Sequence, residues 1–456
     1  MKIKKFLGLS AIAALAVGLA SCGQSADNSH TIDFYTTAGD DYMVPLNAAK
    51  AKYEAENAGW TVNITNGFSY DTLKTKVTQC LSANTQPSVA YCYPDHVANY
   101  LKTGKVVNMQ TYIDDEKLGF TAEEWNDFVP SYMTEGTAYE KEGMYSLPMS
   151  RSTEVIYYNK TVFDANNIKV PTTWDELWNV CVQLKALYPM STPLGYDSEA
   201  NWVITYLEQY AEEHGGKYYT DGSLSGSNKI IFNNDVTKGF FETLKAKYDA
   251  HLFTTQTISG AYTSKLFVKY DKRSESDNAK YKEEYTGSFI SIGSTGGAKN
   301  QAPKDGDAQF AVGIAAVPGI TAEKAVCISQ GPSLVMFDQG SPEKIEMTWK
   351  FVKLLLSSEV QASYCSGGYS PVRKSAFQNP ALIEVMEDGS LAGRVTAFTQ
   401  TLAEKDIFYT SDAFNGSAVA RTQIGAALVT AMKATGTSKI AETISEAADE
   451  AKYYTK

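Results

Sequence analysis

The first hundred residues alternate between two hydrophobic periods, and this alternation constrains the fold more than any other feature. Residues 31–36 (TIDFYT) alternate apolar and polar side chains, as half-buried strands do. Residues 60–65 and 88–91 also have strand character, while residues 42–56 and 71–81 between them carry apolar side chains at helical spacing. A strand–helix–strand–helix–strand order predicts a parallel sheet with helices on both faces. We therefore expect a mixed α/β fold.

The rest of the chain continues in the same style. Thr173 and Glu176 form a capping box that predicts the start of a helix over 174–187. Ser341 is followed by Pro342, a pair typical of a helix start, and predicts a helix to residue 356. With 456 residues, the chain is long enough for two or three domains. We expect further helices over 201–212 and 235–248, strands over 154–158, 310–316, 325–329 and 333–337, and a mostly helical tail over 411–456.

The N-terminus has the features of an export signal. Three lysines precede an apolar run over residues 6–20, which is too short to span a bilayer. The run ends in Leu-Ala-Ser-Cys, which resembles a bacterial lipobox, and that resemblance implies cleavage before Cys22 and acylation of its thiol. We expect residues 1–21 to be a lipoprotein signal peptide and residues 22–30 a tether that anchors the protein to a cell membrane. A plain secretory signal with an incidental cysteine is the alternative.

Charge and cysteine content exclude other classes. Acidic residues outnumber basic ones 52 to 41, and a net charge of −11 disfavours binding to nucleic acid. The five cysteines after Cys22 are spaced too widely for a metal-binding knuckle. Cys80 and Cys181 fall inside apolar helical patterns, so we interpret them as buried small hydrophobes. We predict no metal and no cofactor.

Motifs of known catalytic sites are absent from the sequence. The four histidines form no H-E-x-x-H, and neither G-x-S-x-G nor a P-loop occurs. The Gly-rich stretch 293–297 lacks the lysine and the spacing of a nucleotide cradle. Acidic pairs such as Asp114-Asp115 are more typical of solvated helix caps than of a glycosidase acid and base. These observations favour a protein that is not an enzyme.

Four stretches in combination resemble the extracellular solute-binding proteins of bacterial ABC importers, in the branch that binds sugars and glycerol 3-phosphate. Their most specific elements are TWDEL at 173–177 and GYSPVR at 368–373. The resemblance covers about residues 30–435. The four stretches are 145–168 with 171–178, 286–298, 312–320 with 329–362, and 367–377.

This resemblance implies a two-lobed, type II periplasmic-binding-protein-like fold with a ligand cleft between the lobes. We expect residues 31–147 plus 290–338 in the N-terminal lobe and 148–289 plus 339–456 in the C-terminal lobe. The chain would cross between lobes near 147–150, 288–292 and 337–340. A ligand that touches both lobes would stabilise a closed state, which forms by a hinge motion. The membrane permease would then recognise this closed conformation. We expect the protein to act as a monomer.

Matching residues to the same branch predicts the ligand contacts. Aromatic rings would stack on the C–H face of a sugar, and polar side chains would bind its hydroxyls. Arg421 would favour a phosphate or an acidic sugar. Arg151 beside Ser152 is a further candidate. The predicted ligand-binding residues are Tyr70, Asp95, Ser152, Trp202, Ser294, Gly331, Tyr369 and Arg421.

Two departures from the branch leave the ligand open. The position of a cleft carboxylate aligns with Pro94, one residue before Asp95, and a second cleft tryptophan would align near Glu199. Our leading interpretation is a lipoprotein that captures a carbohydrate and delivers it to an ABC permease. The alternatives are a binder of glycerol 3-phosphate or a glycerophosphodiester, a surface glycoside hydrolase, and an adhesive lipoprotein without a small ligand.

Overall fold

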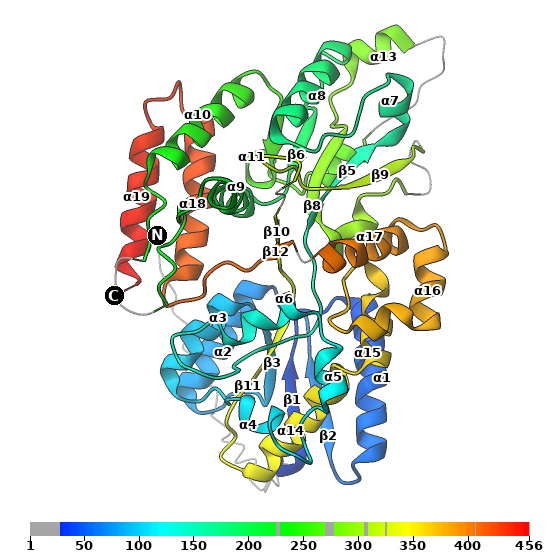
Figure 1. Ribbon diagram of the computed structural model, residues 1–456, viewed down its shortest axis with the longest axis vertical. Coiled ribbons are helices and arrows are strands. Elements are labelled where there is room, and N and C mark those ends of the chain that lie inside the picture. Colours follow the sequence, from blue (N-terminus) through cyan, green and yellow to red (C-terminus); the bar gives the residue numbers. More distant parts are fainter. Residues whose placement is uncertain are drawn as a thin grey trace, which may run out of the picture.

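The computed structural model describes residues 28–224, 229–269, 278–304, 309–323, 326–405 and 407–455. Cys22 and the expected signal peptide lie outside the described residues. Two five-stranded sheets form the centres of two lobes, which lie one above the other in Figure 1 with a short two-stranded ribbon between them. This arrangement confirms the expected α/β class. No helix within the described ranges combines the length and the apolar character needed to cross a bilayer.

The first lobe contains the sheet β2-β1-β3-β11-β4. Strand β1 pairs in parallel with β2 and β3, as the N-terminal alternation predicts, and β11 runs antiparallel to β3 and β4. The strands are β1 (Thr31–Tyr35), β2 (Thr61–Thr65), β3 (Val89–Cys92), β4 (Leu147–Pro148) and β11 (Ser333–Met336). The main helices of this lobe are α1 (Asp40–Glu56), α2 (Tyr70–Ala83), α3 (Pro94–Tyr100), α14 (Pro342–Leu355) and α15 (Ser358–Tyr364).

The second lobe contains the sheet β7-β6-β8-β5-β9. Strand β6 is parallel to β7 and β8, and β5 is antiparallel to β8 and β9. The strands are β5 (Glu154–Asn159), β6 (Leu194–Tyr196), β7 (Phe253–Thr255), β8 (Ile290–Ser294) and β9 (Val312–Ala316). The main helices are α7 (Lys160–Ala165), α8 (Trp174–Leu187), α9 (Glu199–His214), α10 (Asp235–Asp249), α17 (Leu391–Lys405), α18 (Ser417–Lys433) and α19 (Ile440–Tyr453).

Local sequence signals place the helix starts where we expected them. The Thr173 side chain accepts a hydrogen bond from the Glu176 backbone N–H, and the Glu176 carboxylate accepts one from the Thr173 backbone N–H. Helix α8 therefore begins at the predicted capping box. Ser341 caps α14, with Pro342 in the first turn. The remaining elements are η1 (Asn28–His30), η2 (Leu101–Thr103), α4 (Gln110–Ile113), α5 (Ala122–Asn126), α6 (Pro130–Met133), η3 (Thr134–Thr137), α11 (Gln256–Ser259), α12 (Ser264–Phe267), α13 (Asn278–Glu284), η5 (Thr295–Asn300), β10 (Cys327–Ile328), η6 (Cys365–Gly367), η7 (Lys374–Gln378), α16 (Pro380–Glu387) and β12 (Phe408–Tyr409).

The structure distributes the chain between the lobes differently from our expectation. We expected residues 290–338 in the N-terminal lobe, but β8 and β9 pair with β5 in the second sheet. We expected residues 339–456 in the C-terminal lobe, but Trp349 and Phe351 of α14 belong to the first lobe's core. The physical reason is that hydrophobic periodicity predicts a buried strand or helix without saying which sheet it joins.

Two segments that cross between the lobes lie side by side, and a first-lobe segment after η6 pairs with one of them. The first, residues 149–153, agrees with the crossing predicted near 147–150, whereas the second, between β10 and β11, differs from those expected near 288–292 and 337–340. Ser152 exchanges backbone hydrogen bonds of 2.6 and 3.0 Å with Gln330 in the segment between β10 and β11. Arg151 exchanges bonds of 2.9 and 2.6 Å with Ser370, which follows η6. The hinge is therefore a narrow, hydrogen-bonded strip of backbone.

The five cysteines within the described residues are buried and free, and Cys80 and Cys181 lie in helices as we expected. Burial raises the pKa of the Cys327 thiol to about 12 and also raises that of Cys181, so these groups stay neutral at physiological pH. They act as small apolar side chains in the cores.

Candidate functional site

A cavity of about 590 Å³ lies between the two lobes. The first lobe contributes the starts of α2 and α3, and the second contributes the loop after β6 together with α9, α11 and α18. Helix α18 also contacts α3, so the lobes meet at one edge of the cleft. A cavity of about 230 Å³ shares Tyr70 with the main one, and a smaller one beside the hinge shares Tyr93, Asp95 and Arg421. The cleft is thus a main chamber with two side chambers.

Tyrosine rings line the first-lobe wall of this cleft. The rings of Tyr70 and Tyr93 stack with centroids 4.0 Å apart, and Tyr369 contacts Tyr42 edge to face at 5.0 Å. Burial raises the pKa of Tyr369 to about 12 and holds that of Tyr70 well above its usual value, so both hydroxyls remain protonated. Protonated phenols both donate and accept, while their rings offer apolar faces.

Asp95 supplies a carboxylate on the same wall. It lies in the first turn of α3, lines both the main and the hinge-side chamber, and its buried Oδ1 has no hydrogen-bond partner among the residues that the structure describes. The neighbouring His96 ring is 3.7 Å away, but burial lowers the pKa of His96 and so favours its neutral form. A buried acceptor without a partner suits a ligand hydroxyl.

Arg421 of α18 faces the cleft from the second lobe. Its guanidinium donates to Asn201 Oδ1, and Asn201 Nδ2 donates to Glu154 Oε1 at 2.8 Å. The Tyr196 hydroxyl donates to Glu154 Oε2 at 2.6 Å. Burial raises the pKa of Glu154 to about 7, although hydrogen bonds from Tyr196 and Asn201 oppose the shift. A charged side chain from each lobe, Asp95 and Arg421, therefore meets in one cleft.

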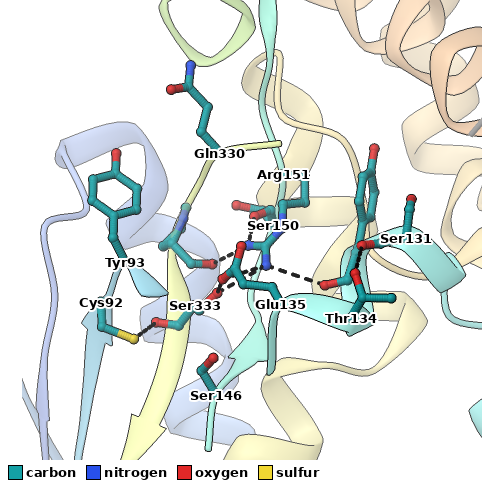
Figure 2. A network of polar contacts seen from close by, with 12 residues as sticks. Cys92, Tyr93, Ser131, Thr134, Glu135, Ser146, Ser150, Arg151, Gln330 and Ser333 are labelled. Carbon is teal, nitrogen blue, oxygen red and sulfur yellow. Dashed lines mark hydrogen bonds and ion pairs between the residues drawn. The ribbon is translucent and has the colours of Figure 1, made fainter. Parts of the chain in front are cut away.

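Arg151 has a structural role instead of the ligand contact that we considered for it. It is 1% exposed and pairs with the equally buried Glu135 at 3.0 Å. The Ser333 hydroxyl donates to Glu135 at 2.6 Å and accepts from Arg151 at 3.1 Å. Figure 2 shows this network, in which Arg151 also reaches backbone carbonyls. The network binds a crossing segment to η3 and β11 of the first lobe.

The structure separates the predicted site residues into three groups. Tyr70, Asp95, Tyr369 and Arg421 line the cleft chambers, so their ligand contacts remain sound predictions. Trp202 is fully buried in the second lobe's core, where it stacks on Tyr196 with centroids 4.6 Å apart. The prediction of Trp202 as a cleft residue conflicts with this placement, because α9 directs that ring toward the sheet.

The other three predicted residues lie beside the cleft without lining a chamber described above. Ser152 and Gly331 are in crossing segments, and Ser152 Oγ donates to the Gln330 carbonyl at 3.4 Å. Gly331 has φ +134°, and a Cβ there would lie 2.5 Å from the Ser150 carbonyl oxygen. Ser294 ends β8, and its carbonyl accepts from the Tyr157 hydroxyl. Direct ligand contact by these residues remains a prediction.

The ligand-binding residues predicted from the sequence did not include Tyr93, Asn201 or Glu154. Tyr93 follows β3 directly, at the carboxyl end of a parallel strand, where ligands of α/β folds bind. Glu154 is the only charged residue of β5, and a buried carboxylate in such a hydrophobic strand requires hydrogen-bond partners. Both signals are readable in the sequence.

Two lobes joined by crossing segments, with a polar and aromatic chamber between them, define a ligand-binding protein of the hinged type. The chain belongs to the bacterial extracellular solute-binding proteins, because the model of that family matches residues 48–391. This confirms the resemblance stated from the sequence motifs.

Relatives of this chain are binding proteins. A multiple sugar-binding protein of Streptococcus mutans is 24% identical over 390 residues, covering 82% of this chain and 83% of the relative. A putative binding protein of Brucella suis is 25% identical over 371 residues, 80% of each chain. The sn-glycerol-3-phosphate-binding periplasmic protein UgpB of Yersinia pestis is 22% identical over 301 residues, 64% of this chain and 62% of the relative.

Solved structures share the fold at low sequence identity. The cyclic α-maltosyl-1,6-maltose binding protein from Arthrobacter globiformis aligns with a TM-score of 0.69 at 15% identity, over 93% of this chain and 98% of that one. UgpB from Mycobacterium tuberculosis, in complex with glycerophosphocholine, aligns with a TM-score of 0.68 at 17% identity and the same coverage. These likenesses establish the two-lobed fold.

Proposed function

We propose that this protein captures a carbohydrate in the inter-lobe cleft and delivers it to the permease of an ABC importer. The observation that carries the proposal is the cleft itself, with stacked Tyr70 and Tyr93 and the unpartnered Asp95 oxygen on one lobe, and Arg421 on the other. Tyrosine faces match the C–H face of a sugar, and the polar groups match its hydroxyls. Sugar-binding relatives and neighbours of the same fold support this ligand class.

A glycerophosphodiester is the second candidate. Arg421 lines the cleft, a guanidinium is the side chain best suited to bind phosphate in a bidentate manner, and one structural neighbour holds glycerophosphocholine. The Asp95 carboxylate beside it would repel a phosphate, so we place a neutral saccharide first.

The relatives of this chain are binding proteins, so the hydrolase alternative has no support among them. The absence of product after prolonged incubation with oligosaccharides is the expected result for a binder. Release of a shorter saccharide would contradict the proposal.

Attachment to the membrane is a separate part of the proposal. Acylation of Cys22 would tether the binder beside its permease and raise its effective concentration there. Mass spectrometry of the purified protein should find a diacylglycerol-modified cysteine at the N-terminus, and Cys22→Ala should remove the lipid. An unmodified chain cleaved elsewhere would favour the plain secretory signal.

A ligand panel tests the binding function. The protein is titrated with maltose, maltotriose, cellobiose and glycerophosphocholine, and the ligand at 100 times its Kd should raise the free energy of unfolding by about 2.7 kcal/mol. Arg421→Ala should weaken binding at least about tenfold, the loss of one hydrogen bond to a charged group. The matched control is Arg394→Ala, which removes a guanidinium bound to the Val312 carbonyl outside the cleft.

The outcomes separate the two candidates. A saccharide that stabilises the wild type, with affinity sensitive to Arg421 but not to Arg394, supports carbohydrate capture. Stabilisation by glycerophosphocholine alone would move the assignment to the second candidate. No stabilisation by any compound in the panel would contradict both.

A further inference from the structure

Glu154 is a buried carboxylate that the pairing of β5 does not need. It is 2% exposed and stands at the first position of the strand, where its backbone lies opposite Ser294 of β8. Both carboxyl oxygens are engaged by neutral donors, Oε2 by the Tyr196 hydroxyl and Oε1 by Asn201 Nδ2. Aliphatic and aromatic residues fill the next four positions of the strand, so the acid has a role beyond packing.

The partners of Asn201 leave its amide only one orientation. Its Nδ2 group donates to Glu154 Oε1 at 2.8 Å and to Gln330 Oε1 at 3.1 Å, which uses both amide protons. Its Oδ1 is then directed at Arg421, which donates to it. If the amide turned over, its oxygen would face the Glu154 carboxylate and its NH₂ would face a guanidinium that has no acceptor. The Glu154 carboxylate and the Arg421 guanidinium hold this orientation from the two ends of the amide by charge-assisted hydrogen bonds.

Arg421 is the final member of this chain of hydrogen bonds, and it lines both the main and the hinge-side chamber. Asn201 is the acceptor that fixes the guanidinium from the second lobe, because it lies on α9 where α18 packs against that helix. The position of the cationic group in the cleft therefore depends on a carboxylate that itself lines none of these chambers.

We propose that Glu154 is a positioning residue that holds the Arg421 guanidinium in its ligand-binding place through Asn201, and that protonation of Glu154 releases this hold. The relevance to ligand binding rests on the function proposed above, whereas the hydrogen-bonded chain itself does not depend on any ligand.

The surroundings of Glu154 allow both of its protonation states near neutral pH. Burial raises its pKa to about 7, with Asp197 acting in the same direction and Arg421 opposing it. The Asp197 carboxylate is itself bound by the backbone and hydroxyl of Thr263. Tyr409 of β12 and Cys327 of β10 also interact electrostatically with Glu154. Burial raises the pKa of both groups, so they remain neutral. The carboxyl is already fully buried, so closure of the lobes adds little further desolvation.

The direction of the pH effect follows. Ionised Glu154 accepts a charge-assisted hydrogen bond from Asn201 and keeps Oδ1 on Arg421, while neutral Glu154 accepts a weaker one. A neutral saccharide that contacts Arg421 therefore prefers the ionised form. Its affinity should rise by about threefold to tenfold as the pH increases through about 7, and binding should release protons.

The first test observes Arg421 without any ligand. The protein is labelled with ¹⁵N-arginine, of which the chain has five, and the Arg421 guanidinium signal is identified by its loss in Arg421→Lys. Between about pH 5 and about pH 9 the wild-type signal should titrate with a midpoint near 7. Glu154→Gln keeps an acceptor for Asn201 but cannot ionise, so it should abolish this titration.

The matched control is Glu208→Gln. Glu208, on α9, is another carboxyl whose pKa burial raises, and its side chain is not among the partners of Asn201 or Arg421. This variant should leave the titration of the Arg421 signal unchanged. An Arg421 signal that does not titrate in the wild type, or that titrates equally in Glu154→Gln, would overturn the proposal.

The second test measures Kd for maltotriose by calorimetry at pH 6 and 8 (about one unit either side of the midpoint). The wild type should bind more tightly at the higher pH, and Glu154→Gln should show no change. Equal pH dependence in the two proteins would overturn the positioning role. If maltotriose does not bind at all, the proposed saccharide specificity fails, while the arginine signal still decides the role of Glu154.

Discussion

Trp202 makes its largest contribution inside the second lobe. Its ring is fully buried, stacked on Tyr196, and in edge contact with Phe253 at 5.0 Å. The indole also lies within 6.2 Å of the Trp178 ring. An aromatic cluster of this kind joins α8, α9 and the sheet, so the ring supports the lobe that presents the cleft.

Trp202→Ala should lower the free energy of unfolding by about 3–5 kcal/mol, because it removes a large buried side chain and leaves a cavity. Urea-induced unfolding measures this change. Trp125→Ala is the control, since Trp125 is only half-buried at the surface of the first lobe and should cost less. Normal stability combined with lost ligand affinity would show instead that Trp202 faces the ligand.

At the scale of elements, the crossing segments depend on close backbone contact. Gly331 adopts φ +134°, which L side chains rarely adopt, next to the Ser150 carbonyl of the neighbouring segment. The buried pair of Arg151 and Glu135 holds the same strip from the first lobe. The hinge is thus both narrow and specified by particular residues.

Gly331→Ala should destabilise the protein by at least about 2 kcal/mol, since both the backbone angle and the added Cβ are strained. Thermal and urea unfolding would detect this loss. Gly297→Ala in η5 is the matched control, because its backbone is unstrained and its Cβ would meet no atom within 4 Å. Equal stability of the two variants would contradict the close contact between crossing segments.

For the whole molecule, buried acids predict how stability changes with pH. Burial raises the pKa of Glu154 to about 7 and also raises that of Glu135, Asp197 and Glu208, so the folded state holds protons that the unfolded chain has released. Stability from such groups is complete below their unfolded pKa and is lost as the pH rises through the folded one. Acids with lowered pKa, such as Asp115 and Glu176, act in the opposite direction only at lower pH, and His96, whose pKa burial lowers, opposes the trend below its ordinary pKa.

The free energy of unfolding should therefore fall as the pH rises from about 5 to about 7.5, with a slope of up to about 1.4 kcal/mol per pH unit for each group. Urea unfolding at several pH values measures it, and Glu154→Gln should reduce the slope over this range. A stability that stays level or rises across the range would contradict these pKa shifts.

Several features of the fold and site were readable from the sequence because they depend on neighbours along the chain. The period of apolar residues predicted β1, α1 and α2, and capping residues placed the start of α8 and α14. Motifs with characteristic residues predicted the solute-binding family, and with it Tyr70, Asp95, Tyr369 and Arg421 at the cleft.

Only the tertiary structure decided which sheet each later segment joins and which way each ring points. Strands β8 and β9 belong to the second sheet because they pair with β5, a contact between residues more than a hundred positions apart. Trp202 faces the core and Asn201, one residue earlier, faces the hydrogen-bonded chain to Arg421, since successive helix positions point about 100° apart. Local sequence determines the period and the ends of elements, whereas burial and pairing depend on atoms contributed by distant segments.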